Sequence, residues 1–336
     1  MQVRSFGHAD GVEIREVSLR NAAGATASVI TWGAVLRDLV VPSPAGPQRV
    51  VLGLNSIEDY RAHSPYFGAT PGRFANRIAG AQFTLDGRRH TLPANERSGA
   101  TLHGGPKGFG AVPWRIEAVA EDSVTLVLDS PDGDEGFPGA VRALCTYTLA
   151  EPGTLVVVFE ATTDAPTVLS LAHHSYFNLD GGPDVLDHEV LLNCPFMTPT
   201  DANLIPTGEI RSVAGTPFDF TTARPIRNEA EQNYDMNFVV ASAPDPATGL
   251  AHAATVRSPK NGLTLELHTD QPGVQFYDAA KLHCPVPGLD GKLYGTHGGF
   301  ALECQVFPDA PNRRHFPSPV LRPGQTYRQR SEYRFA

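Results

Sequence analysis

The chain has 336 residues, of which 27 are basic and 36 acidic, giving a formal net charge of −9 without any block of like charges. Nucleic acids and anionic membranes bind proteins through clustered Lys and Arg, so neither partner is expected, and a small neutral ligand fits better. Gly and Pro are frequent, at 32 and 29 residues, which predicts many turns, and a chain of this length can fold as one large all-β unit.

Short runs that alternate apolar and polar residues, or that are rich in β-branched residues, recur along the chain and predict strands. They lie at 27–32, 35–41, 125–129, 154–162, 168–172, 263–269, 274–278 and 299–307. Turn signals such as Asp86-Gly87 and Asn261-Gly262 separate many of them. The only candidate helix, 225–232, is short and polar. These elements predict an all-β sandwich or barrel in a single domain spanning 1–336.

The cysteines are far apart and form no CxxC pair, which favours reduced, buried thiols over a disulfide framework. They are Cys145, Cys194, Cys284 and Cys304. The N-terminal segment is polar, without the apolar stretch of a signal peptide, and no run of about 18 apolar residues occurs. We therefore expect a soluble, cytoplasmic protein, as a monomer or a homodimer.

Glu303 is a candidate catalytic base because of its place in the strand predicted at 299–307. Alternate residues of this run are apolar and belong to the core, so Glu303 projects from the other face, beside Ala301 and Gln305. A strand can hold a carboxylate rigidly in place. A solvated surface glutamate is the more common reading of such a position, since charged residues are mostly exposed.

Two adjacent histidines in the run 168–178 fall on opposite faces of an extended segment. His173 shares its face with Leu169, Leu171 and Phe177, where a core histidine is expected. His174 has small neighbours, which leaves room for a ligand. A histidine can donate a proton near neutral pH, so His174 is a candidate general acid.

Two loops carry further polar candidates. In 101–110, glycines around His103 would let the backbone approach a ligand closely, although the spacing does not match a phosphate-binding P-loop. In 68–80, the side chains of Arg73, Asn76 and Arg77 could donate hydrogen bonds to the hydroxyl groups of a sugar. Such residues also commonly hold loops in place, so the pattern alone leaves both roles open.

Together these segments resemble the aldose 1-epimerase (galactose mutarotase) family nearly from end to end. The resemblance is carried by GRFANRIAGAQFTLDG at 72–87, LHGGPKGFG at 102–110, HSYFNLDG at 174–181, LIPTGEI at 204–210, GTPFDF at 215–220, YDMNF at 234–238, PGVQFY at 272–277 and LECQVFPDAPN at 302–312. It implies a large antiparallel β-sandwich with few short helices. It also implies an isomerase that interconverts the α and β anomers of a free hexose or pentose, such as galactose or glucose, without a cofactor or a metal.

The resemblance also assigns roles to individual residues. Glu303 matches the family's general base and His174 its general acid. The sugar-binding positions that it implies are Arg73, His103, Asp235 and Gln275. This chain departs from the family where His173 replaces the usual Asn and Met236 the usual His. Both departures put the sugar preference in doubt without removing a catalytic group.

Other readings of the same residues remain open at this point. Imidazole and carboxylate groups could bind a metal ion, although His173 and His174 point to opposite faces and cannot reach one ion together. A β-sandwich could bind sugar without catalysis. A glycoside hydrolase would need two carboxylates about 5–9 Å apart, for which only Asp235 could loosely serve as the second. An epimerase of hexose 6-phosphates should show a basic cluster, and none is found.

Overall fold

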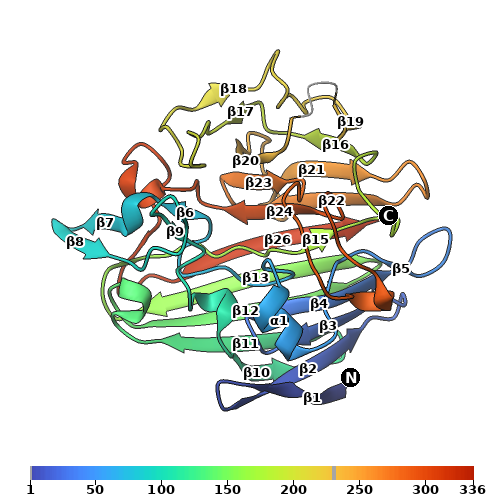
Figure 1. Ribbon diagram of the computed structural model, residues 1–336, viewed down its shortest axis with the longest axis horizontal. Coiled ribbons are helices and arrows are strands. Elements are labelled where there is room, and N and C mark those ends of the chain that lie inside the picture. The colour runs from blue at the N-terminus through green and yellow to red at the C-terminus, as the bar shows by residue number, and fades with distance from the viewer. Residues whose placement is uncertain (1, 229–231) are drawn as a thin grey trace.

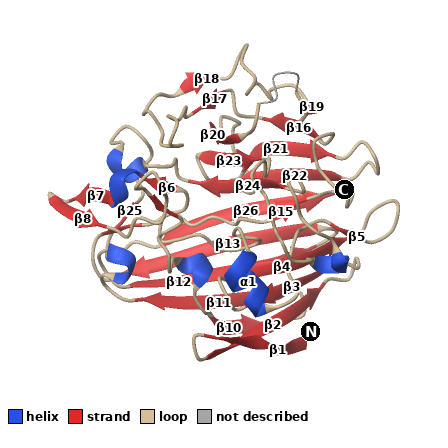
Figure 2. Cartoon of the chain, viewed as in Figure 1, coloured by secondary structure: helices blue, strands red, loops and turns tan. Residues whose placement is uncertain are grey.

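The computed structural model describes residues 2–228 and 232–336. Within these ranges the chain is built mainly from antiparallel strands, with one short α-helix and a few 3₁₀ turns between them (Figures 1 and 2). This confirms the predicted all-β fold with few helices. No helix of the described residues combines the length and the apolar character that crossing a membrane requires.

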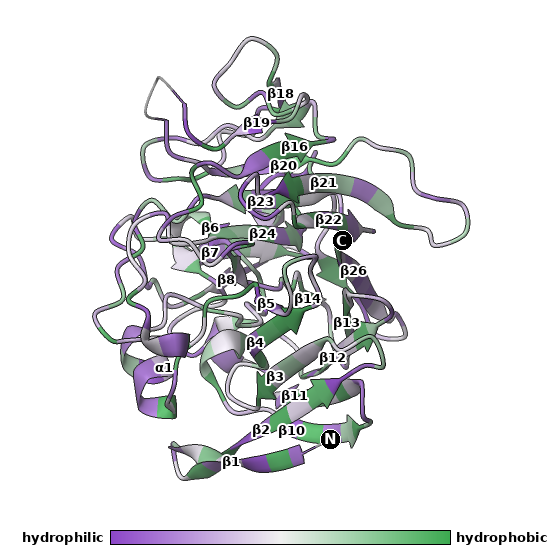
Figure 3. Ribbon diagram, turned by 90° about the vertical axis from the view of Figure 1, so that its right-hand side faces the viewer, coloured by the Kyte–Doolittle hydropathy of each residue, from purple (hydrophilic) through white to green (hydrophobic). Residues whose placement is uncertain are grey.

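The N-terminal part of the chain forms a five-stranded sheet in which neighbouring strands follow one another in sequence. Its strands are β1 (Gln2–Ala9), β2 (Val12–Arg20), β3 (Thr26–Ile30), β4 (Val35–Val41) and β5 (Gln48–Arg49). Apolar residues make up much of the strands β3 and β4, as their green colour in Figure 3 shows. The predicted run 35–41 coincides with β4.

The largest sheet has nine strands, and its order is not the order of the chain. From one edge to the other the strands are β10 (Arg115–Val119), β11 (Ser123–Ser130), β12 (Val141–Ala150), β13 (Thr154–Thr163), β26 (Tyr327–Phe335), β22 (Thr264–Thr269), β21 (Ala251–Arg257), β16 (Glu189–Leu192) and β19 (Arg224–Pro225). Alternate residues of β12 and β13 are buried, as the period-two pattern of their sequences dictates. The C-terminal strand β26 thus lies in the middle of the sheet, between β13 and β22.

A six-stranded sheet carries several of the candidate site residues. Its order is β15 (Tyr176–Phe177), β24 (Phe300–Gln305), β23 (Gly273–Tyr277), β20 (Asp235–Val239), β17 (Phe196–Met197) and β18 (Arg211–Ser212). Both faces of β24 are buried. Its apolar face belongs to the core, and its other face therefore lies under other parts of the chain instead of in solvent.

The remaining elements are short. Three two-stranded sheets pair β6 (Arg77–Ile78) with β9 (Thr101–Leu102), β7 (Gln82–Leu85) with β8 (Arg88–Thr91), and β14 (Thr167–Val168) with β25 (Val320–Leu321). The 3₁₀ turns are η1 (Ala79–Ala81), η2 (Phe109–Ala111), η3 (Asp134–Gly136), η4 (Leu289–Gly291) and η5 (Ala310–Asn312). The Asp86-Gly87 signal forms the tight β7–β8 turn, with both residues at positive φ as such a hairpin requires.

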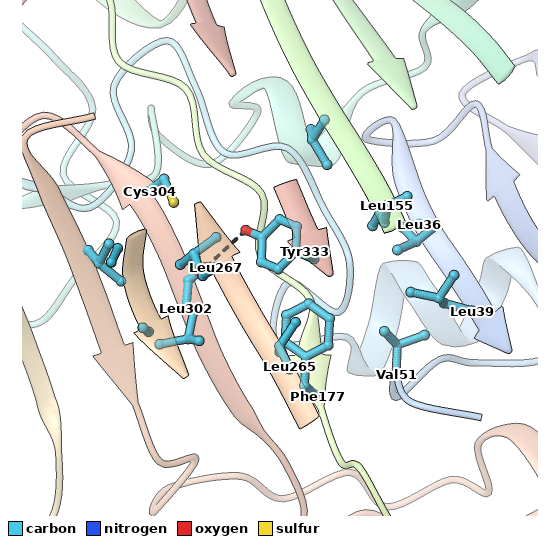
Figure 4. Close-up of a cluster of buried hydrophobic side chains, with 14 of the residues drawn as sticks. Leu36, Leu39, Val51, Leu155, Phe177, Leu265, Leu267, Leu302, Cys304 and Tyr333 are labelled. Atoms are coloured by element: carbon cyan, nitrogen blue, oxygen red, sulfur yellow. Dashed lines mark hydrogen bonds between the residues drawn. The ribbon is translucent and has the colours of Figure 1, made fainter. Parts of the chain in front are cut away.

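The main hydrophobic core draws buried side chains from all three large sheets. The nine-stranded sheet therefore packs against both the five-stranded and the six-stranded sheet. Figure 4 shows part of this core, where Leu39 of β4, Leu155 of β13, Leu265 of β22 and Leu302 of β24 are labelled. The four cysteines are free and buried, as the sequence predicted.

Two helix expectations need correction. The α-helix α1 (Ile57–His63) was not predicted, although the hydroxyl of Ser56 caps it by accepting the backbone N–H of Asp59, a Ser-x-x-Asp signature. The candidate helix 225–232 falls partly on 229–231, outside the described residues. Its described residues form no helix, since Pro225 lies in β19 and residues 226–228 are irregular.

Candidate active site

Glu303 lies in a row of polar side chains that crosses three strands. In the register of the six-stranded sheet, Glu303 of β24 is opposite Gln275 of β23, and Gln275 is opposite Asn237 of β20. Gln275 donates a hydrogen bond of 2.6 Å from Nε2 to Oδ1 of Asp235. Glu303 is only 2% exposed, which contradicts the reading of a solvated surface glutamate. The row forms a buried polar surface on this sheet.

His174 meets Glu303 from a different part of the chain. A bridge to Ala69 holds the backbone of His174, and its Nε2 lies 3.5 Å from Oε1 of Glu303. His174 is 4% exposed. In the described part of the chain, Nδ1 of His174 and Oε2 of Glu303 are buried without a hydrogen-bond partner. The pair therefore keeps unused bonding capacity for a ligand.

The predicted alternation of the two histidines is present, although residues 169–175 form only isolated bridges and no regular strand. His173 points into the core, where its Nδ1 lies 3.2 Å from the hydroxyl of Tyr147. The other departure from the family, Met236, lies on β20 opposite Phe276 and also joins the core. Both departures thus lie behind the polar surface that carries Glu303.

His103 completes a group of two imidazoles and a carboxylate. Its ring centroid lies 5.3 Å from that of His174 and 4.5 Å from that of Tyr66. Nδ1 of His103 accepts a hydrogen bond of 3.1 Å from the backbone N–H of Asn76. Because a backbone N–H only donates, Nδ1 must carry a lone pair, and the hydrogen of the neutral ring is at Nε2. His103 is therefore a hydrogen-bond donor toward the site.

Arg77 also belongs to this site, although the family resemblance assigned the sugar-binding role to Arg73 and not to Arg77. Its Nε and Nη2 bind the two oxygens of Glu96 at 2.7 and 2.8 Å, a bidentate pair that fixes the guanidinium. Burial raises the pKa of Glu303 and lowers the pKa of His103, and the positive charge of Arg77 opposes the first shift and adds to the second. The sequence did contain a signal for this role, because Arg77 is the second arginine of GRFANR and directly follows the candidate binding residue Asn76.

The expectation that Arg73 binds sugar is wrong. Arg73 is 2% exposed, and its guanidinium lies under the loop 130–139. It donates hydrogen bonds to Oγ of Ser130 and to the carbonyl oxygens of Pro131, Pro138 and Gly139, at 2.6–3.0 Å. With these partners Arg73 holds the loop in place and has no donor left for a ligand.

This corrected role predicts a change in stability with little change in sugar binding. Replacing Arg73 with Met would leave several buried carbonyl groups without partners, each costing about 1–3 kcal/mol. We expect the free energy of unfolding, measured by urea titration, to fall by about 2–4 kcal/mol. The KM of the folded variant should stay within about twofold of wild type. A large rise in KM with unchanged stability would return Arg73 to the binding site.

The glycines around His103 also act differently from the expectation. A Cβ on Gly104, whose φ is +86°, would lie 1.8 Å from the carbonyl oxygen of Gly72. A Cβ on Gly108 would lie 2.3 Å from the carbonyl oxygen of His103. These glycines are needed because two segments of backbone, around residues 72 and 103–108, pack against each other. The glycines therefore allow two backbone segments to approach each other, not a ligand, and this packing positions His103.

A comparison with known proteins identifies the family. The aldose 1-epimerase family model matches residues 15–334, nearly the whole chain. The chain belongs to the aldose 1-epimerase family. This confirms the predicted family and enzyme class, an isomerase that interconverts anomers.

Individual relatives agree with this assignment. The chain is 40% identical over 315 residues to galactose mutarotase from Rattus norvegicus, covering 92% of this chain and 90% of the relative. It is 36% identical over 338 residues to aldose 1-epimerase from Escherichia coli (strain K12), covering 97% and 96%. A crystal structure of a GalM/aldose epimerase homologue from C. elegans matches with a TM-score of 0.90 and 32% identity, covering 96% and 98%. The fold of this epimerase is therefore that of its relatives.

Burial sets the proton affinities in the epimerase site. The pKa of Glu303 is raised well above its ordinary value by burial and by the nearby carboxylate of Asp235. Burial lowers the pKa of His174 to about 4. Burial also lowers the pKa of His103 well below its ordinary value, with smaller contributions from His174 and Arg77. The apolar surroundings thus favour the uncharged form of all three groups.

The same three groups could also bind a metal ion, because one ligand atom each from His103, His174 and Glu303 lie within 4.8 Å of one another. The hydrogen bond at His103 works against this use. A histidine that binds a metal usually donates its other ring N–H to an acceptor, whereas Nδ1 of His103 faces the donor N–H of Asn76. Its Nε2, which faces the site, carries the hydrogen. The arrangement suits donation to a sugar oxygen better than metal ligation.

Proposed function

We propose that the chain interconverts the α and β anomers of a free aldose, with Glu303 as general base and His174 as general acid. The observation that carries the proposal is the 3.5 Å contact between Glu303 Oε1 and His174 Nε2 in a buried site. Ring opening needs a group that removes the proton of the anomeric hydroxyl and a group that protonates the ring oxygen. Glu303 of β24 would supply the first group, and His174, from the segment that bridges to Ala69, would supply the second.

The proposed cycle needs one proton shared between the two residues. In the opening step the Glu303 carboxylate takes the proton of the anomeric hydroxyl, while protonated His174 gives its proton to the ring oxygen as the C1–O5 bond breaks. Glu303 is then neutral and protonated, and His174 is neutral. Rotation about C1–C2 and the reverse transfers close the ring to the other anomer. Burial raises the pKa of Glu303 and lowers the pKa of His174, so the neutral pair that follows the opening step is favoured over the charged pair that begins it.

The sugar would be held by the polar side chains around this pair. His103 offers an N–H at Nε2, and the Arg77 guanidinium lies near enough to influence the pKa of Glu303. Asn76, Asp235 and Gln275 are the further proposed contacts. A polyhydroxylated ligand needs both donors and acceptors, and this group provides both. The monosaccharide is proposed to be galactose-like or glucose-like, and the proposed compartment is the cytoplasm, in keeping with the four free thiols.

Polarimetry tests the proposed reaction. Freshly dissolved α-D-galactose and α-D-glucose change their optical rotation slowly as the anomers equilibrate, and the protein should accelerate this decay. The ratio of the two kcat/KM values gives the sugar preference. Sugar binding without any acceleration would favour a non-catalytic carbohydrate-binding protein and overturn the proposal.

His103 is expected to act mainly through binding. Its replacement by Ala removes a buried donor to the sugar, a loss typically worth about 1–3 kcal/mol. We therefore expect KM to rise by about five- to 150-fold, with a smaller fall in kcat. His8 lies on the exposed strand β1, so His8→Ala is a matched control that should leave both parameters unchanged. If His103→Ala changes neither KM nor kcat, His103 has only a structural role.

A further inference from the structure

The strand that carries Glu303 lacks a continuous neighbour on one edge. β24 pairs with β23 from Ala301 to Gln305. On the other edge, β15 reaches only Phe300 and Ala301. Buried backbone groups must find hydrogen-bond partners, so the edge of β24 that β15 leaves unpaired beyond Ala301 requires partners from elsewhere.

Side chains supply these partners along the open edge. The hydroxyl of Tyr333 donates a hydrogen bond of 3.0 Å to the carbonyl oxygen of Leu302. Nε2 of Gln329 donates one of 2.9 Å to the carbonyl oxygen of Cys304. Both residues belong to β26, in the middle of the nine-stranded sheet, and the two carbonyl groups lie immediately before and after Glu303. The backbone that carries Glu303 is thus attached to the opposite sheet on both sides.

Tyr333 also contacts the segment that carries the second catalytic group. Its ring centroid lies 5.4 Å from that of His173, the neighbour of His174, and 5.2 Å from that of Phe177. Figure 4 shows Tyr333 beside Phe177, with its hydroxyl bonded toward Leu302. The ring is fully buried and therefore held by packing. One side chain touches both segments that meet in the site.

We propose that Tyr333 and Gln329 are positioning residues, whose hydrogen bonds to the backbone on either side of Glu303 hold its carboxylate against His174. This inference rests on the proposed role of Glu303 as the base. Neither residue touches the sugar or transfers a proton. Their effect on the rate comes from the geometry of β24, because a displacement of about 1 Å can cost on the order of 10² in rate.

Tyr333→Phe tests the inference by removing a single hydroxyl while keeping the ring. We expect a fall in kcat of about tenfold, corresponding to a shift of a fraction of an ångström, with KM within about twofold of wild type. Polarimetry gives both parameters, and circular dichroism checks the fold. Gln329→Met removes the other donor at similar volume and should act in the same direction. If Tyr333→Phe does not fold, the kcat of Gln329→Met decides the test.

A control separates positioning from general destabilisation. Tyr294 is also buried, and its hydroxyl bonds the carbonyl oxygen of Gly53 and the N–H of Leu289, away from β24. Tyr294→Phe removes a comparable hydroxyl and should lower the melting temperature without changing kcat. An equal loss of kcat in Tyr294→Phe and Tyr333→Phe would show that stability alone is responsible, and would overturn the proposal.

A double-mutant cycle connects the effect to Glu303. In Glu303→Asp the shorter side chain already withdraws the carboxylate, so adding Tyr333→Phe should change kcat by less than about twofold. An undiminished tenfold loss in this background, or a kcat within about twofold of wild type for both Tyr333→Phe and Gln329→Met, would refute the positioning role. Wild-type kcat in Glu303→Gln would instead refute the base itself, so the two failures are distinguishable.

Discussion

Replacing Glu303 with Gln is expected to lower kcat by about 10²- to 10⁴-fold, the usual contribution of a positioned proton-transfer group. Glutamine has nearly the same shape and can keep the place of the carboxylate in the row with Gln275 and Asn237. It cannot accept the proton of the anomeric hydroxyl. Polarimetry on α-D-galactose measures the loss, with the spontaneous rate subtracted. Undiminished activity in this variant would remove Glu303 from its role as base.

The same variant should be more stable than wild type at neutral pH. Because the pKa of Glu303 is raised in the folded state, the folded protein binds a proton that the unfolded chain has already released. The free energy of unfolding therefore falls as the pH rises from the ordinary glutamate pKa through the raised pKa. Glutamine does not ionise and avoids this loss. A higher melting temperature together with lower kcat would show that the loss of activity does not come from unfolding.

Replacing His174 with Asn is expected to lower kcat by a comparable factor, about 10²- to 10⁴-fold. An amide can donate a hydrogen bond to the ring oxygen but cannot transfer a proton to it. Among the ion pairs of the described residues, His174 is the only basic group paired with Glu303. A kcat close to wild type would mean that another group protonates the sugar.

A control for this variant is available on a distant hairpin. His90 lies on β8, where its ring stacks on Phe83. His90→Asn makes the same chemical change outside the site and should leave kcat unchanged. If both variants lose activity equally, the loss reflects damage to the fold, and the assignment of His174 as the acid would not stand.

The local patterns of the sequence predicted the features that depend on neighbouring residues. Alternation along 299–307 placed Glu303 opposite the apolar face of β24, because side chains of a strand alternate strictly. The same rule separated His173 from His174, even though their segment is not a regular strand. The strand 35–41 was predicted with its observed bounds. In each case the signal lay within a few residues.

Features that depend on distant contacts were not predictable in this way. Nothing near Arg73 in the sequence indicates that the loop 130–139 will cover it, so its role could not be separated from that of Arg77. Asn76 and His103 both adopt positive φ, at 63° and 52°, conformations that a propensity argument assigns to glycine. These conformations persist because Asn76 and His103 hold each other through the 3.1 Å hydrogen bond. Only the assembled fold reveals them.

The central place of β26 has a consequence for the order of assembly. During synthesis β26 leaves the ribosome after all other strands described here, yet it separates β13 from β22 in the finished sheet. Until Tyr327–Phe335 is available, β10–β13 and the group of β16, β19, β21 and β22 have no shared edge. The two groups of strands therefore become one sheet only when Tyr327–Phe335 inserts between them.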